Sequence, residues 1–113
     1  MSKQTQPKIL KDILHVLDEN QSVDVIAIHV EPHTTVTDYM VVCSGRSSRH
    51  VKAIAENTIE DMKSKGFRLI GESGLQTAEW ILLDFGDVVV HVMQPSVRAF
   101  YHLEGLWTSP SKE

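Results

Sequence analysis

The stretch Val41–Arg49, with the sequence VVCSGRSSR, places a cysteine, three serines and two arginines directly after an apolar run. Cys43 precedes Arg49 by six residues, which is the spacing of a cysteine phosphatase. In such a site a thiolate is the nucleophile, while backbone N–H groups and a guanidinium hold the phosphoryl oxygens. Phosphoryl transfer is therefore the first chemistry to test.

The details of this stretch do not fit that chemistry. A phosphate-binding loop of this type usually carries a histidine immediately before the cysteine and a glycine three residues after it. Val42 and Arg46 occupy those positions here. The cysteine thus lacks its usual activation, and the alternative is that Cys43 packs as a small apolar residue at the end of a buried strand.

The pattern Ser44-Gly45-x-Ser47 is also similar to the phosphate-holding turn of nucleotidyltransferases. That chemistry needs two metal ions, and hence two or three carboxylates that converge from a neighbouring strand. The next strand candidate, residues 67–72, carries no paired acids, and Asp84 and Asp87 bracket a predicted hairpin turn. The simpler prediction is that the serines cap a helix beside a tight backbone corner.

Composition limits the remaining function classes. The chain has 113 residues, 42% of them hydrophobic, which suits one domain with a single core. Its net charge of −4 opposes binding to bare phosphate backbone, so we expect no direct nucleic-acid readout. The six histidines show no metal-ligand spacing, and we predict neither a metal nor a cofactor.

The N-terminus is polar, and no run approaches the roughly 20 apolar residues of a membrane span. The single cysteine fits a reducing compartment. We therefore expect a cytoplasmic protein with no membrane partner.

Hydrophobic periodicity and turn residues predict the order of the elements. The patterns give helices over 8–19, from Ser44 or Ser47 to Gly66, and over 95–104, with strands over 23–30, 38–43, 67–70, 78–83 and 88–93. Residues 1–7 are predicted to be flexible and 108–113 disordered, which leaves 8–107 as the domain. This order predicts an α/β sandwich, a mixed sheet of about five strands with helices packed on it.

The segment Asp84–Asp87 predicts a hairpin turn whose length decides which side chains share a face. An even loop gives one purely aliphatic face, whereas a three-residue loop would bury a charge among valines. We therefore expect the even loop, with Trp80 directly across from His91. The aliphatic face then holds Ile81, Leu83, Val88, Val90 and Val92, and the other face holds Trp80, Leu82, Asp84, Asp87, Val89, His91 and Met93.

A sheet face with a tryptophan anchor and an acidic rim is typical of a protein-binding surface, because tryptophan concentrates in interface hot spots. The alternative is structural, since cross-strand aromatic pairing stabilises a hairpin by up to about 1 kcal/mol. Both interpretations of Trp80 and His91 remain open at this point.

Several segments together resemble the ribosomal silencing factor family, also called Iojap-like. The resemblance covers about residues 8–107, and the hairpin from Trp80 to His91 is its most specific part. The segments are TDYMVVCSG (37–45), SRHV (48–51), AEWILLDFGDVVVHVM (78–93) and RAFYHLEGLW (98–107). The chain departs from the family at His50, where glutamine is usual, and at Phe85, where tyrosine is common.

The resemblance implies a non-enzymatic protein that binds the large ribosomal subunit through its protein fourteen, at the face where the small subunit docks. It would block subunit association by steric exclusion and so repress translation when nutrients are scarce, as in stationary phase. The family fold is similar to that of nucleotidyltransferases without their metal carboxylates. That likeness would explain why residues 43–49 look like an active site.

On this interpretation Trp80 anchors a basic ribosomal partner, and Asp84 and Asp87 pair with its cations. The predicted partner-binding residues are Trp80, Leu82, Asp84, Asp87, His91, Met93, Tyr101, Glu104 and Trp107. The last three would extend the surface from the final helix, although a core role is the alternative for Tyr101. Two rival hypotheses stay open: a phosphoryl-transfer enzyme (a cysteine phosphatase or a degenerate nucleotidyltransferase) that uses the Cys43–Arg49 turn, and a homodimer of the free protein through the same face.

Overall fold

The computed structural model describes residues 7–30 and 37–101. In these residues the chain forms three helices and five strands. Their order is α1 (Lys8–Glu19), β1 (Val23–His29), β2 (Tyr39–Ser44), α2 (Ser48–Ser64), β3 (Gly71–Ser73), β4 (Trp80–Asp84), β5 (Val88–Met93) and α3 (Pro95–Tyr101). The predicted α/β domain is confirmed.

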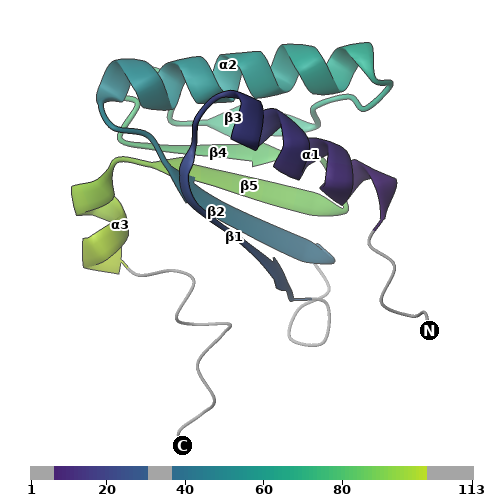
Figure 1. Ribbon diagram of the computed structural model, residues 1–113, viewed down its shortest axis with the longest axis horizontal. Coiled ribbons are helices and arrows are strands. Elements are labelled where there is room, and N and C mark those ends of the chain that lie inside the picture. The colour runs from purple at the N-terminus through teal and green to yellow at the C-terminus, as the bar shows by residue number, and fades with distance from the viewer. Residues whose placement is uncertain (1–6, 31–36, 102–113) are drawn as a thin grey trace, which may run out of the picture.

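The five strands form one mixed sheet in the order β1-β2-β5-β4-β3. The central strands β2 and β5 are parallel, and the other neighbours are antiparallel. Central strands are shielded on both faces, which explains why β2 and β5 are almost wholly apolar. Helices α1 and α2 lie together over one face of the sheet, and α3 follows β5 apart from them (Figure 1).

The main core lies between the sheet and the layer of α1 and α2. Helix α1 turns one apolar stripe inward at helical spacing, with Leu10, Ile13 and Leu17 fully buried. The sheet contributes Val41, Cys43, Ile81, Leu83, Val88, Val90 and Val92. The opposite side of the sheet, away from α1 and α2, is called the outer face below.

Helix α2 begins and ends where the sequence predicts. The Ser47 hydroxyl oxygen accepts a hydrogen bond from the His50 backbone N–H at 3.1 Å, so Ser47, not Ser44, is the N-cap. Gly66 follows the helix with φ of 95°, a left-handed conformation that favours glycine.

The predicted strand over 67–70 is wrong. The Phe67 N–H donates to the Met62 carbonyl at 2.8 Å, so this backbone completes the end of α2 and is not available to the sheet. Pairing with β4 begins only when the Ile70 N–H reaches the Asp84 carbonyl at 2.7 Å, and the strand is Gly71–Ser73. The predicted end of the last helix at residue 104 and the predicted tail lie outside the described residues.

Candidate functional site

Three backbone donors at the turn between β2 and α2 form hydrogen bonds within the protein. The Gly45 N–H donates to the Met93 carbonyl at 3.1 Å, and the Arg46 N–H donates to His50 Nδ1 at 2.9 Å. The His50 N–H is bound by the Ser47 cap. An anion cradle needs such N–H groups to point at its ligand, so these three donors are not available to a phosphate group.

The thiol beside this turn is also unsuited to nucleophilic attack. Cys43 is fully buried, and burial raises the pKa of its thiol to about 12. A reactive cysteine requires a lowered pKa, because the thiolate is the nucleophile. Arg49 has an exposed side chain, whereas the buried Arg98 donates from Nη1 to Ser44 Oγ at 3.1 Å. The geometry supports the packing role for Cys43.

The β4–β5 hairpin closes with a two-residue turn. The Phe85 N–H donates to the Val88 carbonyl at 2.9 Å across Gly86 and Asp87. The even loop is therefore confirmed. The aliphatic face is fully buried as predicted, with Ile81, Leu83, Val88, Val90 and Val92 each at 0% exposure.

The predicted direct opposition of Trp80 and His91 is wrong. The turn is centred on Gly86 and Asp87, one residue later than the predicted loop 84–87, so each partner on β5 shifts by two residues. Trp80 therefore lies opposite Met93, and Leu82 lies opposite His91. Trp80 and His91 are instead diagonal neighbours on the outer face, with ring centroids 6.0 Å apart. The Trp80 indole N–H donates to His91 Nδ1 at 3.0 Å.

This hydrogen bond defines the protonation of the imidazole. An indole N–H can only donate, so His91 Nδ1 accepts and the proton of the neutral ring lies on Nε2. Burial lowers the pKa of His91 to about 4. The ring is therefore neutral at pH 7 and remains able to accept from Trp80.

The two predicted rim acids differ in their surroundings. Asp84 Oδ1 accepts a hydrogen bond from the Gly86 N–H at 2.8 Å, which ties this carboxylate to the turn. Asp87 is exposed, and its backbone carbonyl accepts from the N–H of Asp38 and of Tyr39. Only Asp87 presents a carboxylate without a structural task, which makes it the better candidate for a charged contact.

The predicted partner-binding residues also differ in exposure. Trp80, Leu82 and Asp84 are half-buried on the outer face. His91 and Met93 are buried, at 8% and 0% exposure, so their predicted role changes from direct contact to support beneath the surface.

The remaining predicted contacts cannot be placed, and one further residue joins the site. The side chain of Tyr101, and the whole of Glu104 and Trp107, lie outside the described parts of the chain. Val89 pairs with Asp84 and is half-buried on the outer face. The alternation along β5 places Val89 on this face. Because Val89 lies between two other valines, the sequence gives no sign that its side chain remains accessible while theirs are buried.

Comparison with known proteins identifies the family of this chain. The family model described as "Ribosomal silencing factor during starvation" matches residues 3–113. The chain belongs to this family. It is 39% identical over 99 residues to the protein named ribosomal silencing factor RsfS of Haemophilus influenzae, a match that covers 88% of this chain and 97% of the relative.

Other members and structures agree with this assignment. A crystal structure of a Chromobacterium violaceum protein has a TM-score of 0.87 and 37% identity, covering 95% of this chain and 87% of that one. A mouse relative named "Mitochondrial assembly of ribosomal large subunit protein 1" is 32% identical over 99 residues, covering 85% of this chain and 43% of the relative. The predicted family resemblance is confirmed, while the likeness to nucleotidyltransferases stays a prediction.

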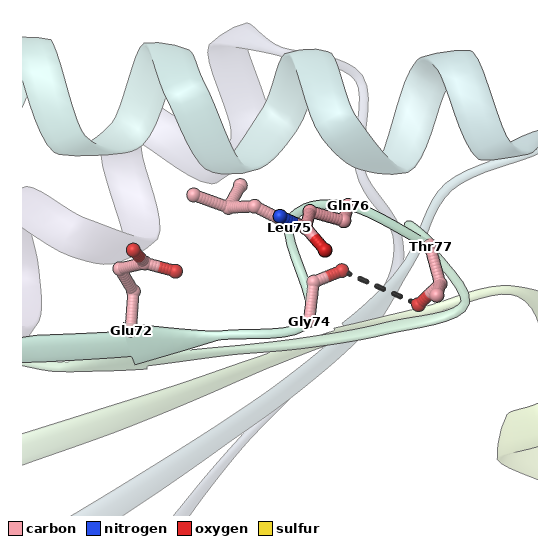
Figure 2. A pocket seen from close by; sticks show the side chains of 5 residues that line it. All are labelled: Glu72, Gly74, Leu75, Gln76 and Thr77. Atoms are coloured by element: carbon pink, nitrogen blue, oxygen red, sulfur yellow. Dashed lines mark hydrogen bonds between the residues drawn. The ribbon is translucent and has the colours of Figure 1, made fainter.

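In this family member, a separate hollow of about 420 Å³ lies at the connection from β3 to β4, on the α2 side of the sheet (Figure 2). Its lining residues are Glu72, Gly74, Leu75, Gln76 and Thr77. The Thr77 hydroxyl donates to the Gly74 carbonyl at 3.5 Å, which closes the loop on itself. With one carboxylate and no cysteine or histidine in its lining, the hollow has no pair of groups for acid–base or nucleophilic chemistry.

Residues 7–30 and 37–101 contain no group of three or more histidine, cysteine, aspartate or glutamate side chains that could hold a metal ion. No helix among them combines the length and the apolar character that a membrane crossing requires.

Proposed function

We propose that this protein binds the large ribosomal subunit through ribosomal protein fourteen, using the outer face of β4 and β5. The observation that carries the proposal is the position of Trp80. This half-buried tryptophan lies on the outer face of the sheet, which α1 and α2 do not cover. Half-buried tryptophans beside apolar and acidic residues are typical anchors of protein interfaces.

The bound protein blocks association with the small subunit by occupying space at the intersubunit face. Family membership supports this role, because the family is described as a silencing factor that acts during starvation. The name of the mouse relative supports the choice of the large subunit. Repression of translation under nutrient limitation, in the cytoplasm, follows from the same proposal.

Charge supports the class of partner. The chain carries a net charge of −4, and Asp87 is exposed at the turn that ends the outer face. A basic ribosomal protein is electrostatically complementary to such a surface. The proposed mechanism needs no cofactor and no turnover.

Sedimentation of the protein with separated ribosomal subunits tests the choice of partner. We expect co-sedimentation with the large subunit alone, and Trp80→Ala should weaken it at least about thirtyfold, as truncation of a central hot-spot residue costs about 2 kcal/mol or more. Phe67→Ala, which truncates a half-buried aromatic packed on the core of α1 and α2, is the matched control and should bind normally. Thermal melts of both variants identify any loss of fold.

The blocking mechanism has its own experiment. Protein added to separated subunits should reduce the joined-ribosome peak in proportion to its occupancy of the large subunit. Joining that continues at saturating occupancy, or that stops far below one protein per ribosome, would contradict steric exclusion. Ultracentrifugation of the free protein would reveal a homodimer that uses the same face.

A further inference from the structure

We propose that His91 is a positioning residue for Trp80, which fixes the indole so that a docking partner meets the carbon atoms of the ring while the indole N–H stays bonded within the protein. This inference rests on the proposed function, because it concerns the same docking surface. It assigns a task to a buried histidine and defines the kind of group that Trp80 accepts.

The geometry connects two strands through one hydrogen bond. Trp80 is the first residue of β4, and its Nε1 lies 3.0 Å from Nδ1 of His91 in β5. The residue directly opposite Trp80 is Met93, which is fully buried on the same face. The hydrogen bond favours one rotamer of the indole. Binding a partner therefore costs less conformational entropy at Trp80.

His91 acts through Trp80 and not by contact with the partner. Only 8% of His91 is exposed, so little of the ring is within reach of a docked protein. The ring accepts the indole hydrogen bond at Nδ1, and burial keeps it neutral at pH 7. On the outer face, the side chains of Leu82 and Val89 have no hydrogen-bond acceptor for the indole. The Asp84 carboxylate lies at the other end of β4 and accepts from the Gly86 N–H.

The bond also limits what Trp80 recognises. A satisfied indole N–H does not need a carbonyl or carboxylate oxygen from the partner. The exposed part of Trp80 is then an apolar π-surface, which suits an aliphatic side chain or the guanidinium or ammonium group of a basic protein. We therefore expect an apolar or cationic side chain of the partner against the ring.

A double-mutant cycle tests this role by large-subunit affinity. His91→Leu removes the acceptor at similar size, His91→Asn keeps an acceptor oxygen near the position of Nδ1, and Trp80→Phe keeps an aromatic ring without the donor. His91→Leu should weaken binding by about fivefold, the usual value of one hydrogen bond. His91→Asn should restore affinity, and His91→Leu should have no further effect in the Trp80→Phe background.

A second readout does not depend on the ribosome. The indole N–H signal of Trp80, assigned by its absence in Trp80→Phe, should be shifted and protected from exchange in the wild type and in His91→Asn. In His91→Leu this signal should move and exchange faster. Thermal melts establish that each variant is folded.

The outcomes separate the two hypotheses. If the wild type binds and folded His91→Leu binds equally well, or if His91→Leu costs the same in the Trp80→Phe background, the positioning role is wrong. If the wild type itself does not bind the large subunit, the proposed function fails and the docking role of His91 fails with it.

Discussion

The turn after β2 and the hairpin of β4 and β5 both place polar groups at strand ends, and they differ in where those groups find partners. In the turn, the N–H groups of Gly45, Arg46 and His50 all bond within the protein, and the Cys43 thiol is sealed. In the hairpin, Trp80 is anchored at its N–H yet stays half-exposed, and the Asp87 carboxylate remains in solvent. The hairpin is therefore the better candidate for the proposed docking surface.

This difference shows that the types of residue in a segment do not reveal whether their polar groups are accessible to a ligand. Cysteine, serine and arginine in the turn suggest phosphoryl transfer, but a donor that already has an internal partner cannot hold a ligand without breaking that bond. The hairpin shows fewer reactive residue types and keeps an accessible surface. A candidate site is better judged by the groups that the fold leaves accessible than by the chemistry its residues could perform.

The largest expected effect is a loss of stability at low pH, which arises from the buried His91 of the hairpin. The pKa of His91 is lowered by burial from 6.5 to about 4, so the unfolded chain binds more protons between these values. The contribution of neutral His91 is fully present above pH 6.5 and is lost as the pH falls toward 4, on the order of 3 kcal/mol. Urea unfolding of the wild type and His91→Leu at pH 7.5 and 4.5 measures it, and equal pH dependence in both proteins would contradict it.

A smaller loss of stability should follow from adding a side chain at Gly45 in the turn. A Cβ at position 45 would lie 2.8 Å from the Val51 backbone nitrogen, so Gly45→Ala should destabilise the protein by about 2 kcal/mol. Gly71→Ala is the matched control, because a Cβ there meets no atom within 4 Å. Denaturant melts compare the two. A stable Gly45→Ala protein would show that the corner is less tight than the geometry indicates.

The thiol of the turn should prove replaceable. Cys43→Ser should cost about 1 kcal/mol and leave large-subunit binding unchanged, because the thiol only packs. The native protein should also resist alkylation at pH 8, since burial raises the pKa of Cys43 to about 12. Rapid labelling of folded protein, or hydrolysis of an aryl phosphate that Cys43→Ser abolishes, would restore the phosphatase hypothesis.

The smallest effect concerns the acidic rim. Asp87→Lys should weaken large-subunit binding by less than about 1 kcal/mol, mainly through slower association at low salt. Asp87 is the cleaner choice because Asp84→Lys would also remove the hydrogen bond to Gly86. Glu56→Lys makes the same charge change at an exposed site on α2 and should bind normally. Equal affinities of the two variants would mean that the rim charge plays no part in docking.

Much of the fold could be predicted because its signals are local. The apolar stripe predicts α1, the β-branched run of valines at 88–90 and 92 predicts β5, and the Ser47 cap with Gly66 bounds α2. The strand over 67–70 was mispredicted because residue preferences do not reveal that the Phe67 N–H is already bonded to Met62. In the candidate site, the outer face was predicted from its alternation, but the burial of Met93 depends on its surroundings in three dimensions.

The sequence by itself determined which side chains share a face within each strand of the hairpin, because alternation along a strand depends only on the backbone of that strand. The tertiary structure decided the pairs. The contact of Trp80 with His91 depends on a register set by the position of the turn, and Arg98 reaches Ser44 and Val23 only because α3 returns to the ends of β1 and β2. Such contacts join residues that are distant in sequence, so no local pattern encodes them. The bond from the Gly45 N–H to the Met93 carbonyl is another such contact, and it occupies one donor of the turn.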